Sequence, residues 1–166
     1  MASVKKDVNE IVDINLSAIQ KKRFRIDGDN NRILELNTSD LNLLSRLKEA
    51  YPKLIALANE AFEKWPKEAD DATQEDVDFM SDPTITTSIE ILQNVDSEMR
   101  KLLDYIFDSN VSEMCAPSGS MYDPLNGKLR YEHIVETLAG LYEHDISTEM
   151  NKIATRVNKH TDKYHK

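Results

Sequence analysis

The residues best suited to binding a cation lie in one short run. Asp27, Asp29 and Asn31 occupy alternate positions, as the first oxygen ligands of a calcium loop do. Such a loop also needs glycine at its sixth position and a bidentate glutamate at its twelfth, where this sequence has Arg32 and Thr38. The run therefore favours a β-hairpin turn over a calcium site, because Gly, Asn and Asp accept the positive φ angles of tight turns.

Candidate nucleophiles and metal ligands lack partners at useful spacing. Cys115 has no neighbouring histidine in the sequence to activate it, which favours a structural buried thiol over a catalytic one. Residues 118–120 lack the Gly-x-Ser-x-Gly pattern of a nucleophile elbow, and no Gly-Lys-Ser/Thr phosphate loop occurs. No two histidines are three or four residues apart, which favours surface side chains over a zinc site: His133, His144, His160 and His165. We expect a non-enzymatic protein with no catalytic residue, cofactor or metal.

Charge is distributed unevenly along the 166 residues, whose net charge is −9. Residues 60–82 contain nine acidic side chains against two lysines, which favours a solubilising linker over a tuned catalytic pair. Basic side chains cluster at residues 21–25, beside Phe24, and along the last expected helix. The pattern favours a solvated helix face, then a protein-binding face, and least a nucleic-acid contact. The candidate partner-binding residues of that face are Lys152, Arg156, Lys159 and Lys163.

The element expected to position everything else is a long helix over residues 83–110. Apolar residues recur from Pro83 to residue 114 at steps of mostly three and four, which places them on one helix face that ends near residue 110 or 114: Ile85, Ile89, Leu92, Val95, Met99, Leu102, Leu103, Ile106, Phe107 and Met114. Pro83 suits the first turn, where its missing N–H has no helical acceptor. We expect the other segments to wrap this apolar seam completely and to leave only a charged exterior for recognition.

An N-terminal hairpin is expected over residues 22–36, where two alternating runs flank the Gly/Asn/Asp cluster. Phe24 and Ile26 should share a face with some of Ile33, Leu34 and Leu36. The hairpin must lie on helices, because a lone hairpin is only marginally stable in water.

The flanking helices carry signals for starts and interruptions. Residues 38–40 (Thr-Ser-Asp) predict a helix start, and Pro52 predicts a kink or a break before a second helix that runs to about Trp65. Residues 73–76 match a capping box that predicts a short helix. Later helices are expected over residues 130–143 and 148–163, with a break at residues 145–147. The first of them should turn Ile134, Leu138, Leu141 and Tyr142 inward, with Val135 at the edge.

Composition agrees with one mainly α (α+β) domain, a helical bundle around the long central helix with the small hairpin. Hydrophobic residues make up 40% and charged residues 31%, as in soluble globular chains, and four glycines favour helices over a turn-rich β fold. We expect a flexible arm over residues 1–12 and a single domain over residues 13–166. One cysteine, no signal peptide and no bilayer-length apolar run predict a cytoplasmic protein with no membrane contact.

Three stretches together resemble a known class of proteins: residues 22–40 (KRFRIDGDNNRILELNTSD), 131–134 (YEHI) and 159–164 (KHTDKY). The combination resembles small acidic proteins encoded among the tail genes of phages and prophages of Gram-positive bacteria, which are often regarded as tail assembly chaperone-like. The resemblance implies a non-enzymatic helper that binds another tail protein, with the tape-measure protein as the candidate, in the cytoplasm of the host bacterium. The alternative is a phage-encoded inhibitor of a host defence or nucleic-acid-binding protein that acts through its acidic surface.

Overall fold

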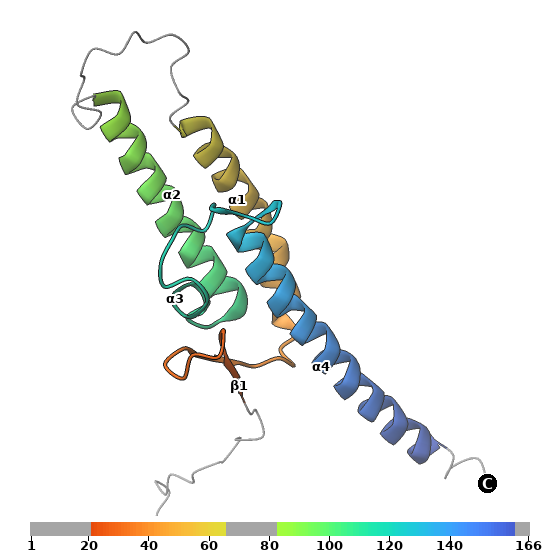
Figure 1. Cartoon of the computed structure of the whole chain (residues 1–166). Coiled ribbons are helices and arrows are strands. Elements are labelled where there is room, and N and C mark those ends of the chain that lie inside the picture. Colours follow the sequence, from red (N-terminus) through yellow and green to blue (C-terminus); the bar gives the residue numbers. More distant parts are fainter. Residues whose placement is uncertain (1–20, 66–82, 162–166) are drawn as a thin grey trace, which may run out of the picture.

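The computed structural model describes residues 21–65 and 83–161 of the chain. Within these ranges three long helices form the body of the molecule, and a small hairpin lies at one end of it beside a short helix (Figure 1). In chain order the elements are β1 (Lys22–Arg25), β2 (Ile33–Leu36), α1 (Asn42–Lys64), α2 (Pro83–Phe107), α3 (Val111–Cys115), β3 (Pro124–Leu125), β4 (Lys128–Leu129) and α4 (Arg130–Thr161). The predicted mainly helical fold with an N-terminal hairpin is confirmed.

The hairpin forms as the alternating sequence predicts. β1 and β2 pair antiparallel with Phe24 opposite Leu34, and Asp27 and Gly28 take positive φ angles of 50° and 74° in the turn. Leu34 and Leu36 are fully buried, whereas Phe24 packs partly buried against the same core. One face of this hairpin is therefore held by the helices.

α2 is the central helix, and its apolar stripe is the core of the molecule. The fully buried members of that stripe are Leu92, Val95, Met99, Leu103, Ile106 and Phe107. The helix ends at Phe107, where the next residue, Asp108, has a φ of +48° that no helix continues. Arg46 of α1 donates from Nε to the carbonyl of Ile106 at 2.8 Å and so satisfies one of the free carbonyls at this end. The predicted boundary near residue 110 is therefore slightly too long, and α3 follows as a separate helix.

α1 is a single helix in which Pro52 causes no break. The prediction of a possible break failed because Pro52 lies on the exposed side, where water can bond the carbonyl that its missing N–H leaves free. On the opposite side the buried positions continue without a gap: Leu43, Ala50, Leu54, Ala58 and Ala61. Burial of this stripe holds the helix together across the proline.

The start of α1 also differs from the prediction. Residues 38–40 predict a helix start, but the Thr38 hydroxyl donates to Asp145 of α4 and does not cap the helix. Asp40 accepts a hydrogen bond from the Asn42 N–H at 2.9 Å, and the helix begins only at Asn42. A contact between segments distant in sequence has replaced the local cap.

α4 is continuous, so the break predicted at residues 145–147 is wrong. That stretch contains neither Pro nor Gly, and the Thr148 hydroxyl donates to the His144 carbonyl one turn back at 2.9 Å. The buried face also lies slightly to one side of the predicted one, because Val135 is buried and Leu141 only half-buried.

Aromatic pairs join α4 to the other two long helices. The rings of Phe107 and Tyr142 lie 5.9 Å apart and those of Tyr51 and Tyr131 lie 6.3 Å apart, both in tilted arrangements. The predicted arm over residues 1–12 and the predicted capping-box helix at residues 73–76 lie outside the described residues. No helix in the described ranges is both long enough and apolar enough to cross a bilayer.

Candidate functional site

The predicted partner-binding face lies on the second half of α4 and stays a prediction, because only two of its four side chains are described. Lys152 and Arg156 are exposed on the second half of α4, and Lys152 pairs with Glu149 on the same helix at 2.6 Å. Lys159 lies on the same helix further along, and Lys163 lies outside the described residues. Neither Lys152 nor Arg156 lines either of the two hollows described next.

An apolar groove on the opposite half of the molecule offers a better-formed surface. Its larger part, about 560 Å³, lies between α1 and the β3–β4 hairpin. The lining residues are Tyr51, Ile55, Ala58, Asn59, Phe62, Pro124, Gly127, Lys128, Leu129, Tyr131 and Glu132. Most of these present carbon to the groove, which is the composition expected of a surface that holds an apolar ligand or peptide.

A second hollow of about 290 Å³ continues the first toward the end of α1. It is lined by Ala61, Phe62, Trp65, Tyr122, Asp123 and Pro124. Phe62 and Pro124 belong to both hollows, and we call the combined surface the α1 groove. Phe62 and Trp65 are 57% and 58% exposed, so two large aromatic side chains lie open to water at its centre and end. The expectation of a purely charged exterior is therefore wrong.

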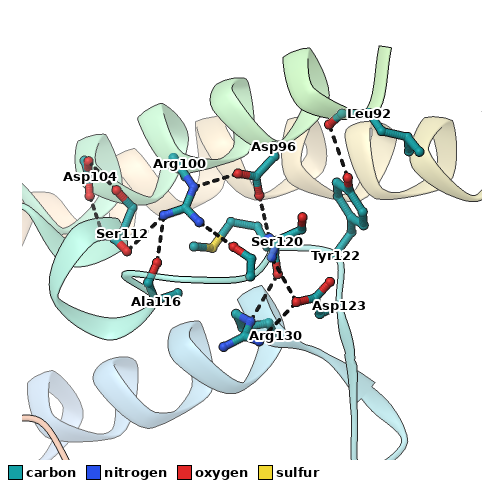
Figure 2. Close-up of polar contacts among 12 residues, drawn as sticks. Leu92, Asp96, Arg100, Asp104, Ser112, Ala116, Ser120, Tyr122, Asp123 and Arg130 are labelled. Carbon is teal, nitrogen blue, oxygen red and sulfur yellow. Dashed lines mark hydrogen bonds and ion pairs between the residues drawn. The ribbon is translucent and has the colours of Figure 1, made fainter. Parts of the chain in front are cut away.

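Side chains between residues 122 and 132 form the wall opposite α1, and the loop that precedes them is held in place by Arg100 of α2. Figure 2 shows the guanidinium donating to the carbonyls of Ser112, Ala116 and Gly119 at 3.2, 2.9 and 2.7 Å, while Nε pairs with Asp96 at 2.7 Å. Charge-assisted bonds of this kind are stronger than neutral ones. The loop therefore has a defined shape although it contains no regular structure over residues 116–120.

Arg32 holds the same strip of backbone from the other side. Its Nε and Nη2 donate to the carbonyls of Met114 and Cys115 at 2.8 and 3.2 Å. Asp104 completes the arrangement by accepting from the backbone N–H and the hydroxyl of Ser112 at 2.7 and 2.9 Å. Two guanidinium groups thus satisfy five carbonyls of residues 112–119.

Further hydrogen bonds and an ion pair hold the residues that connect this loop to the groove wall (Figure 2). Asp96 accepts from the Met121 N–H at 2.6 Å, and the Tyr122 hydroxyl donates to the Leu92 carbonyl at 3.3 Å. Asp123 pairs with Arg130 at 3.1 Å at the start of α4. Pro124, which lines both hollows, comes directly after these anchors.

Gly119 is required where this loop passes the Asp123–Arg130 pair. Its φ is +79°, and a Cβ at this position would lie 2.6 Å from Asp123 Oδ2 and 2.7 Å from Arg130 Nη2. The hairpin that follows turns at Asn126 and Gly127, whose φ angles of 48° and 82° suit a two-residue turn. Residues 124–129 thus form a small hairpin that the sequence pattern did not predict.

The pKa values of two groups in and near this region indicate a packing role and not a catalytic one. Burial raises the pKa of Tyr131, which lines the α1 groove, to about 12, and burial raises the pKa of Cys115 to about 11. Both groups therefore stay protonated at neutral pH, unlike an activated nucleophile. Across residues 21–65 and 83–161, no three His, Cys, Asp or Glu side chains are placed to hold a metal ion.

The remaining sequence candidates have structural roles. Asp27 and Asp29 lie in the hairpin turn, where Asp29 Oδ1 accepts from the Asn31 N–H at 2.9 Å. His133 Nε2 lies 2.7 Å from the carbonyl of Leu125 and so ties α4 to β3. Cys115 is half-buried behind the loop.

The chain was compared with protein-family models, curated proteins and solved structures. None of them matches it.

The sequence reading missed the α1 groove, although one signal for it was present. Ile55 and Phe62 extend the apolar face of α1 beyond the stripe formed by Leu54 and Ala61. A helix with one neighbour buries a narrow stripe, so extra apolar width indicates either a second neighbour or an open binding face.

Proposed function

We propose that this protein is a non-enzymatic, tail assembly chaperone-like protein of a phage or prophage, and that it binds another tail protein in the cytoplasm of the host bacterium. The observation that supports this best is the α1 groove, an apolar surface open to water with Phe62 and Trp65 exposed in it. Exposed apolar surface that is built on rigid elements is characteristic of protein-binding sites.

The occupant that fits is an amphipathic helix of the client, with the tape-measure protein as the candidate. Ile55 and Trp65 are ten residues apart on α1, about 15 Å at ~1.5 Å per residue, which matches roughly three turns of a client helix. Ile55 and Phe62 would contact its apolar side. The net charge of −9 and Glu132 in the lining favour basic residues along its edges.

The test compares two exposed apolar side chains of α1. Phe62→Ala removes an aromatic anchor of the α1 groove, whereas Leu44→Ala alters a residue that is 62% exposed and lines neither hollow. We expect Phe62→Ala to weaken binding to the purified tape-measure protein of the same phage by about tenfold or more, and Leu44→Ala by less than about twofold. Isothermal titration calorimetry measures both, and circular dichroism checks that both variants remain folded.

Two outcomes would overturn the proposal. One is the absence of binding to the tape-measure protein and to the other tail proteins of that phage. The other is an equal affinity for the wild type and Phe62→Ala. Binding to a basic host protein that falls steeply with salt would instead support the inhibitor alternative.

A further inference from the structure

The second half of α4 leaves the bundle and has no neighbour among the described residues. Figure 1 shows the helix continuing well past the start of α1. Every residue from 147 to 156 is exposed, and the last buried side chain of the helix before them is Tyr142. A helical segment as short as residues 147–161 is only marginally stable in water without a packing partner.

This projecting segment nevertheless carries an apolar stripe. Ile146 is half-buried at the edge of the core, and Met150 and Ile153 follow at 54% and 46% exposure. Steps of four and three place the three side chains on one side of the helix, and Val157 follows four residues later in the sequence. This 3–4 spacing is that of the a and d positions of a coiled coil.

We propose that a second copy of this chain covers the stripe, with the two α4 helices antiparallel about a twofold axis near residues 151 and 152. In this alignment Met150 lies opposite Ile153 of the other copy, and the twofold axis repeats the contact. Ile146 then lies opposite residue 157.

Charge selects the antiparallel direction. Glu149 and Arg156 are seven residues apart, so both occupy the same edge of the stripe. Antiparallel pairing brings Glu149 of each copy beside Arg156 of the other and forms the ion pair twice. Parallel pairing would instead place these two residues beside Ala154 and residue 161 of the second copy, where no ion pair forms.

The residues on both edges of the apolar stripe are compatible with this antiparallel pairing. Arg156 is exposed and makes no ion pair with another residue that the structure describes, and Glu149 holds only the exposed Lys152 on its own helix. Ser147 and Ala154 lie on the other edge, and their small side chains allow two helices to approach closely. The surface is therefore complementary to itself, as a twofold interface requires.

The test is a charge exchange measured by sedimentation velocity on the full chain. Arg156→Glu and Glu149→Arg each place like charges opposite one another in a homodimer, so we expect each to weaken self-association about tenfold or more. An equimolar mixture of the two variants restores opposite charges at both contacts, and we expect it to associate about as tightly as the wild type. Thr155→Arg, on the far side of the helix, is the matched control and should change nothing.

The proposal is overturned if the wild type sediments as a monomer up to a few hundred micromolar, or if the mixture associates no better than either variant alone. This interface is separate from the α1 groove. Phe62→Ala should leave self-association unchanged while it weakens tape-measure binding. Failure of either proposal is therefore visible without failure of the other.

Discussion

A single carboxylate, that of Asp145, joins the hairpin, the start of α1 and α4. Lys22 donates to it from Nζ at 2.6 Å, and the buried Thr38 hydroxyl donates to the same oxygen. These two hydrogen bonds, that of Lys22 first, hold the pKa of Asp145 below its ordinary value of 3.8. The folded protein therefore favours the charged carboxylate.

Replacing Asp145 with Asn should destabilise the protein by about 1 kcal/mol at pH 7, because both bonds lose their charge and Lys22 is more than half exposed. A folded pKa that lies below the unfolded one adds stability at higher pH, and that stability is lost as pH falls through the folded value. The difference in unfolding free energy between wild type and Asp145→Asn should thus be constant above about pH 5 and shrink below about pH 4.

Urea unfolding at a series of pH values measures this gap. Glu143→Gln, an exposed change two residues away on α4, is the control and should show no such trend. A difference in unfolding free energy that grows as pH falls would contradict a lowered pKa of Asp145.

At the scale of elements, Pro52 lowers the stability of α1. Burial of the opposite face of the helix offsets this cost. Pro52→Ala restores a backbone donor on an exposed side of the helix and removes the ring from the preceding turn. We expect a gain of about 1–2 kcal/mol, reduced from the full penalty of proline because the unfolded chain also becomes more flexible. The urea midpoint of Pro52→Ala should rise, and the neighbouring control Lys53→Ala should leave the midpoint nearly unchanged. A lower midpoint for Pro52→Ala would show that the proline ring contributes to the native packing.

The elements that the sequence predicted well are those governed by one long-range pattern. α2 was predicted because its stripe from Leu92 to Phe107 keeps one helical period, and the hairpin because its alternation surrounds a Gly/Asn/Asp turn. The predicted interruptions failed for two different reasons. Burial of the face opposite Pro52 outweighs the penalty of the proline, whereas residues 145–147 contain neither Pro nor Gly to end a helix.

The shape of residues 112–119, which precede the groove wall, could not be predicted for a different reason. The bonds from Arg32 and Arg100 to loop carbonyls join residues up to 83 positions apart and follow no periodic pattern. The exposure of Phe62 and Trp65 likewise depends on which face of α1 its neighbours leave uncovered, and spacing along one helix does not determine that. The basic residues of α4 were singled out for their charge, whereas the better-formed surface is apolar.

At the scale of the whole molecule, stability should decrease from the bundle toward the far end of α4. Amides of α2 beside Met99 and Leu103 lie in the centre of the core, whereas those of residues 147–156 belong to the part of α4 that has no described neighbour. Local opening free energies in proteins range from about zero at such ends to the global value of about 5–15 kcal/mol in the core.

Hydrogen exchange at low micromolar concentration should therefore be fastest, among the described helices, at residues 147–156 and slowest in the middle of α2. Raising the protein concentration should slow exchange at residues 147–156 specifically, because a second copy would cover them. Exchange that is equally slow in both segments at high dilution would show that the end of α4 is stabilised within a single chain.

The two arginines that hold residues 112–119 also have an evolutionary consequence. Arg32 and Arg100 come from the hairpin region and the central helix, yet both serve the carbonyls of one irregular strip. A descendant gene that deleted part of this strip would leave each cation with fewer acceptors, Asp96 for Arg100 and Asp27 for Arg32, so natural selection should replace both together. Paired loss of these arginines with loop shortening is the signature expected among diverged relatives.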